Sequence, residues 1–103
     1  MATKTRKKVK VSAFDAANYL KTDADCLAYL QACLDEAGDD PSVIAEALGA
    51  IARARGGMSK VAKSAGLTRE GLYKALAKDG NPSLGTVLKV SRALGVRLVA
   101  EAA

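Results

Sequence analysis

One glycine, Gly66, separates two short helical patterns, and this break constrains the fold more than any other feature of the sequence. The stretch "SKVAKSAGLTREGLYKAL" runs from residue 59 to residue 76. Glycine adopts a left-handed backbone at low steric cost, which ends a helix abruptly. Thr68, two residues later, is a preferred N-cap and begins the next helix. The pattern therefore predicts a helix-turn-helix motif at about 58–78, with two helices that meet steeply across a tight turn.

Each of these two helical patterns divides into an apolar and a polar side. The inward-facing positions are Val61, Ala62, Ala65, Leu72, Ala75 and Leu76. Ser59 is expected to cap the first helix, and Leu67 to fill the corner at the turn. Gly71 lies inside the second helix, where glycine costs roughly 1 kcal/mol relative to alanine. Close approach to another helix or to DNA is one explanation for it.

The outward side of the second helix carries three cations, a tyrosine and few acids. Such a helix fits the major groove of double-stranded DNA, with its N-terminal residues nearest the base edges. Arg69 suits a guanine, whereas Lys60 and Lys63 suit phosphates. The predicted DNA contacts are Ser59, Lys60, Lys63, Thr68, Arg69, Glu70, Tyr73, Lys74, Lys78, Asn81 and Ser83. The alternative is a helical hairpin whose polar face only meets solvent.

The rest of the chain predicts further helices within one domain. A basic flexible tail over 1–10 precedes a single domain over 11–103, because a chain of 103 residues builds one core. Helical segments are expected for a turn or two from Asp15, between Thr22 and Gly38, over 41–55, and over about 59–65, 68–77 and 84–94. Short strands are expected at "VKVSAF" and over 96–100, where apolar and polar residues alternate. The predicted fold class is all-α, with five or six helices and a short C-terminal strand.

Two longer helices have clear start signals and apolar stripes. Thr22 with Asp25 forms a capping-box pattern, and Asp40 followed by Pro41 suits a helix start. The expected stripe of the first helix is Leu27, Leu30, Leu34 and Ala37, with Cys26 and Cys33 beside it. The expected stripe of the second is Ile44, Ala47, Leu48 and Ile51.

Charge is segregated along the chain. The net charges are +5 over 1–10, −7 over 11–50 and +7 over 51–103. Segregation of this kind indicates two surfaces with different partners, one of them a polyanion. Plain solubility is the alternative explanation for the acidic region.

Several classes of function are disfavoured. Cys26 and Cys33 are seven residues apart on one helix, so their Cα atoms lie roughly 10 Å apart, too far for a disulfide. Two cysteines without histidine do not complete a zinc site, and the absence of histidine removes the usual nucleophile–base pairs. "GMSKVAKS" resembles a phosphate-binding loop, but Ala62 replaces a glycine and a helix rather than a strand precedes it. No enzyme activity, cofactor or metal is expected.

A longer stretch resembles a known family. "ALGAIARARGGMSKVAKSAGLTREGLYKALAKDGNPSLGTVLKVSRALGVRL" is similar to HigA-type addiction-module antitoxins, a branch of the lambda-repressor-like helix-turn-helix proteins. The similarity extends upstream to "FDAANYL" and so covers nearly everything after the basic tail. Other members tend to have alanine where this chain has Gly71.

The resemblance implies a homodimer that binds a palindromic operator in its own promoter and neutralises a small basic RNase toxin. The DNA-reading positions of the family fall on Thr68, Arg69, Glu70, Tyr73 and Lys74. The acidic residues expected to meet a basic toxin are Asp23, Asp25, Asp35 and Glu36. The dimer interface is expected to include the C-terminal helix and the residues Val96, Leu98 and Val99.

Two other functions remain open alongside the antitoxin. One is a stand-alone prophage-type repressor without a toxin, and the other is a protein-interaction module that does not bind DNA. No apolar stretch is long enough to span a bilayer, and no apolar signal core follows the basic N-terminus. A cytoplasmic location without membrane contact is therefore expected.

Overall fold

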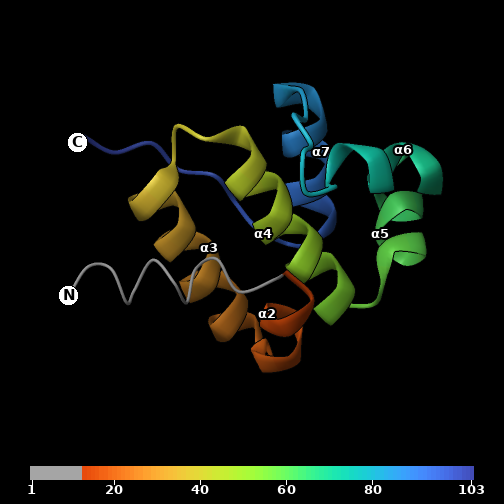
Figure 1. Ribbon diagram of the computed structural model, residues 1–103, viewed down its shortest axis with the longest axis horizontal. Coiled ribbons are helices and arrows are strands. Elements are labelled where there is room, and N and C mark those ends of the chain that lie inside the picture. Colours follow the sequence, from red (N-terminus) through yellow and green to blue (C-terminus); the bar gives the residue numbers. More distant parts are fainter. Residues whose placement is uncertain (1–12) are drawn as a thin grey trace.

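The computed structural model describes residues 13–103, and it describes their side chains from Ala16 onward. This part of the chain forms six helices and no strand (Figure 1). The helices are α2 (Ala13–Tyr19), α3 (Asp23–Ala37), α4 (Pro41–Ala54), α5 (Met58–Ala65), α6 (Arg69–Ala75) and α7 (Leu84–Ala93). The predicted all-helical class is confirmed. None of the helices described is long and apolar enough to cross a membrane.

Helix α4 forms the centre of the fold, with α2 and α3 packed against it (Figure 1). Its buried residues are Ala45, Ala47, Leu48, Gly49, Ala50, Ile51 and Ala52. A helix that is apolar on most of its circumference is buried on most of it. The four alanines and the glycine let neighbouring helices come close, since the distance between helix axes depends on the side chains at the contact.

The start of α4 is fixed as predicted. The Asp40 carboxylate accepts a hydrogen bond from the backbone amide of Ser42 at 3.0 Å and another from its hydroxyl at 2.8 Å, and Pro41 opens the helix. These hydrogen bonds from Ser42 hold the pKa of Asp40 below its ordinary value, because they stabilise the ionised form. The helix ends before Gly56 and Gly57, which both have positive φ.

Helix α3 has the predicted capping box, but its buried side differs from the predicted stripe. The Asp25 amide donates to Thr22 Oγ1 at 3.1 Å, and the Thr22 amide donates to Asp25 Oδ2 at 3.1 Å. Cys26, Leu30 and Cys33 are buried, whereas Leu27 and Leu34 are 52% and 39% exposed. The predicted stripe is wrong at both leucines, because α4 covers the side of α3 that carries the cysteines.

The two cysteines are buried and free, as expected for small apolar core residues. Burial raises the pKa of both thiols above the ordinary value, so both are neutral near pH 7. Neutral, buried thiols are poor nucleophiles, and their role in this fold is packing.

The predicted strand at 96–100 is wrong. After α7 the backbone turns at Gly95, where φ is 76°, and the Val96 amide donates to the Ser91 carbonyl at 2.8 Å. Val96 packs against the core, but the residues that follow pair with no other extended segment in 13–103. An extended segment needs such a partner for its backbone groups to form a strand.

At the N-terminal side, α2 begins at Ala13, two residues before the predicted start at Asp15. The last two residues of the predicted "VKVSAF" strand belong to this helix. The other four, like the predicted basic tail over 1–10, lie outside the described residues.

Candidate nucleic-acid interface

The turn between α5 and α6 has the predicted left-handed glycine. Gly66 has φ 74° and ψ 29°, and its amide donates to the carbonyls of Ala62 and Lys63. The Leu67 amide donates to the Ala62 carbonyl at 2.9 Å, which completes a Schellman-type ending of α5. Leu67 is half-buried against the core, as expected for the residue at the corner. Three residues therefore separate the two helices and set the direction of α6.

Replacing Gly66 tests this turn. A Cβ at this position would have no atom within 4 Å, so the cost comes from the backbone conformation alone. We expect Gly66→Ala to lower the free energy of unfolding by about 1–2 kcal/mol, and Gly66→Asn to cost less, since asparagine tolerates the left-handed region better. Urea denaturation of the two variants measures this order. Equal stability of Gly66→Ala and the unmodified protein would contradict the left-handed conformation.

The predicted cap of α5 by Ser59 is wrong. The helix begins one residue earlier, at Met58, and Gly57 occupies the N-cap position with no side-chain hydrogen bond. Met58 is buried in the core, and its burial favours a helix that begins one residue before Ser59. Ser59 is instead an exposed residue of the first turn.

Helix α6 is held by a cap at its start and by apolar residues beneath it. Thr68 Oγ1 accepts from the Gly71 amide at 2.9 Å. Leu72 is fully buried, and Leu76 is 5% exposed. A Cβ on Gly71 would meet Thr68 Oγ1 at 2.8 Å and no other atom outside the helix within 4 Å. The glycine therefore leaves room for the cap and does not serve contact with another helix described here.

The opposite side of α6 is open to solvent. Arg69, Glu70, Tyr73 and Lys74 are all exposed. The guanidinium carbon of Arg69 lies 5.3 Å from the centre of the Tyr73 ring, a cation–π contact one helical turn apart. This contact limits the directions available to Arg69, which stands at the first position of the helix.

All eleven residues predicted to contact DNA are exposed, and they come from α5, α6 and the loop that leads to α7. Helices α5 and α6 lie together at one end of the molecule (Figure 1). Ser83 also has a structural role, because its hydroxyl accepts from the Thr86 amide at 3.1 Å and caps α7. In the described part of the chain, the ion pair found is Arg55 with Asp23, so the cations of α5 and α6 are not neutralised by neighbouring acids.

The acids predicted to meet a toxin differ in their surroundings. Asp25 is engaged in the capping box, and Asp23 forms the ion pair with Arg55. Asp35 Oδ1 accepts from Gln31 Nε2 at 2.9 Å but remains exposed. Glu36 is exposed as well. The structure thus leaves Asp35 and Glu36 as the more available carboxylates of α3.

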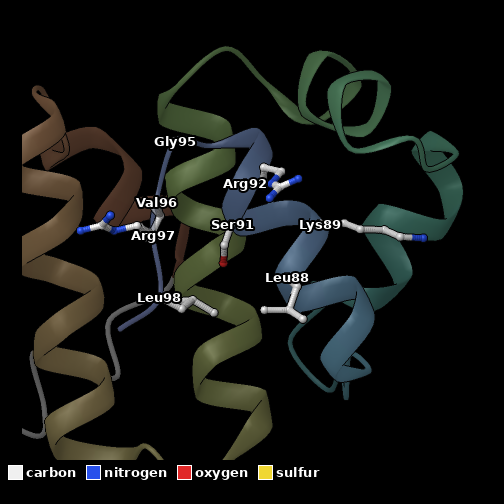
Figure 2. Close-up of a pocket in the computed structure, with 8 residues that line it drawn as sticks. All are labelled: Leu88, Lys89, Ser91, Arg92, Gly95, Val96, Arg97 and Leu98. Carbon is white, nitrogen blue, oxygen red and sulfur yellow. The ribbon is translucent and has the colours of Figure 1, made fainter. Parts of the chain in front are cut away.

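Exposed apolar residues lie on α7 and on the C-terminal segment. Leu84 and Leu88 of α7 are exposed, as are Leu98 and Val99, whereas Val96 packs inward. The side chains of Leu88 and Leu98 line a pocket of about 560 Å³, together with Ser91 (Figure 2). Leu84 and Leu88 were not predicted from the sequence. The spacing of four residues between Leu84 and Leu88 indicates a second apolar stripe on this helix, beside the stripe that contains Val87 and Val90.

A family model described as "Probable addiction module antidote protein" matches residues 10–102 of this chain. The chain belongs to this antidote family. An uncharacterized protein of Haemophilus influenzae is 48% identical to it over 84 residues, which cover 82% of this antidote and 84% of that protein. No solved structure matches the chain with statistical significance. Membership implies that this antidote has a toxin of the same module as its partner.

Proposed function

We propose that this antidote binds an operator of its own module as a homodimer, represses transcription there, and neutralises a basic RNase toxin in the cytoplasm. The single observation that carries the DNA-binding part is the exposed cationic face of α6, held outward by the Gly66 turn and by buried Leu72. A helix presented in this way at one end of a small domain fits the major groove.

The proposed contacts divide into those that read bases and those that bind the backbone. Arg69 lies in the first turn of α6, where a guanidinium donates two hydrogen bonds to O6 and N7 of a guanine. Tyr73 supports Arg69 and meets a thymine methyl group or a phosphate. Lys60, Lys63 and Lys74 neutralise phosphates, which fixes the position of the helix without reading sequence.

The proposed homodimer uses the apolar face of Leu84, Leu88, Leu98 and Val99. Exposed apolar side chains gathered from two parts of the chain indicate a protein interface. A single short helix reads few base pairs, whereas two copies about 34 Å apart read two half-sites one turn apart. A two-fold interface at α7 supplies the second copy of α6 for a palindromic operator.

Electrophoretic mobility shifts on the promoter of the module test the proposal. A dimer that neutralises about seven phosphates predicts a slope near −6 when the logarithm of affinity is plotted against that of salt concentration. Arg69→Ala is expected to cost about 1–3 kcal/mol at one base pair, while Lys63→Ala weakens all sequences alike. Lys21→Ala is the matched control, because Lys21 is an exposed lysine between α2 and α3. A flat salt response, or an equal effect of Lys21→Ala and Lys63→Ala, would rule out the assigned contacts.

The second candidate function is a toxin-binding module that does not touch DNA. The exposed Leu27 and Leu34 on α3 favour a protein partner independently of α6. This alternative predicts no shift of the promoter fragment by the unmodified chain and no effect of Arg69→Ala on any activity.

A further inference from the structure

Helix α3 presents a second apolar stripe to solvent, on the side that α4 does not cover. Leu27 and Leu34 are seven residues apart, which places them within about 20° of each other around the helix and about 10 Å apart along it. Both are substantially exposed, although Cys26, Leu30 and Cys33 of the same helix are buried. Two leucines aligned in this way form a docking edge of the kind that anchors a partner in helix-mediated recognition.

The charges of α3 are of one sign. The helix carries Asp23, Asp25, Asp35 and Glu36 and no basic residue. With about 100° of rotation per residue, Asp35 lies about 80–100° from the leucine stripe, whereas Asp25 and Glu36 lie on the far side of the helix. Asp23 is in line with the leucines but is paired with Arg55. Asp35 therefore borders the stripe as an exposed carboxylate that accepts a hydrogen bond from Gln31 and lies outside the Asp23–Arg55 ion pair.

We propose that Leu27, Leu34 and Asp35 form the surface on which this antidote docks a basic protein partner, the toxin of its module. The inference rests on the proposed function, which supplies a basic toxin, and deepens it by naming the anchoring residues. Charge complementarity selects the partner: an acidic border attracts a basic surface and speeds the encounter, while desolvation of the two leucines supplies affinity. Of the four acids predicted from the sequence, Asp35 is assigned the direct role, and Asp25 and Glu36 are excluded by their position.

The docking surface lies far from the DNA-facing helix. Helix α3 packs on α4, and α6 packs on α5, so the central helices separate the two surfaces (Figure 1). A partner on α3 does not cover Arg69 or Tyr73.

Binding of the antidote variants to the purified toxin of the module tests the surface, with Kd measured by calorimetry and the association rate by stopped-flow mixing. Leu27→Ala and Leu34→Ala are each expected to raise Kd at least about fivefold, and the double variant about thirtyfold. Asp35→Asn lowers the association rate and weakens its salt dependence, whereas Glu36→Gln changes neither. Tyr19→Ala is the matched apolar control, since Tyr19 is 74% exposed at the end of α2 and belongs to no proposed interface. Thermal melts of the exposed-site variants check that each remains folded.

The outcomes separate this inference from the proposed function. A double variant that binds the toxin within twofold of the unmodified antidote overturns the docking surface, as does loss of toxin binding in Tyr19→Ala alone. Failure to bind the operator with toxin binding intact contradicts the proposed function and leaves the docking surface standing. Weakened toxin binding by the double variant with operator binding unchanged supports both.

Discussion

Leu72→Ala is expected to lower the free energy of unfolding by about 3 kcal/mol, the largest effect of any change considered for this protein. Leu72 is fully buried, and it is the buried residue of α6 itself. Its truncation removes apolar burial and leaves a cavity between α6 and the core. A domain of this size has only about 5–15 kcal/mol of stability, so the variant loses a large share of it. Urea denaturation followed by circular dichroism measures the change.

The adjacent residue provides the control. Tyr73 is 46% exposed, and its ring contacts the Arg69 guanidinium on the surface of the helix. Tyr73→Ala is therefore expected to change stability by no more than about 0.5 kcal/mol, as for other surface substitutions. Under the proposed function, Tyr73→Ala weakens operator binding directly. Leu72→Ala lowers operator binding only because less of the protein is folded. If both variants were equally stable, α6 would not be anchored through Leu72.

Gly80→Ala is expected to cost about 2–3 kcal/mol, for a steric rather than a cavity-forming reason. Gly80 is buried in the loop between α6 and α7. A Cβ there would overlap the carbonyl oxygen of Ala75 and lie 2.9 Å from that of Ala77. Both atoms belong to the backbone, so relief requires movement of the end of α6 or of the loop itself. Thermal unfolding of the variant measures the loss.

A second glycine in the same region gives the opposite expectation. A Cβ on Gly85, in the first turn of α7, would meet only Ser83 Oγ, at an ordinary 3.8 Å. Gly85→Ala is therefore expected to raise stability by about 0.5–1 kcal/mol, because alanine favours the helix. If Gly80→Ala and Gly85→Ala destabilised the protein by similar amounts, the backbone around these two glycines would differ from the one described.

The exposed side of α6 was predictable because it follows from the local sequence pattern. Thr68 and Gly66 define the limits of the turn, and the buried Leu72 then determines which residues of α6 face outward. All of the predicted contact residues are exposed accordingly. The role of Gly71 was not predictable from the sequence. Glycine is unfavourable within a helix, and the reason for it here is the position of the Thr68 side chain, which only the structure shows.

The sequence by itself determined the helix boundaries that depend on neighbours within a few residues: the capping box of Thr22 and Asp25, the Asp40 cap and the Gly66 stop. Each is a hydrogen bond or a backbone preference that the local chain satisfies alone. The tertiary structure decided which side of α3 is buried. This helix carries leucines and cysteines on more than one side, and the position of α4 decides which of these residues are covered. It also decided that residues 96–100 form no strand, because an extended segment becomes one only when another segment lies beside it.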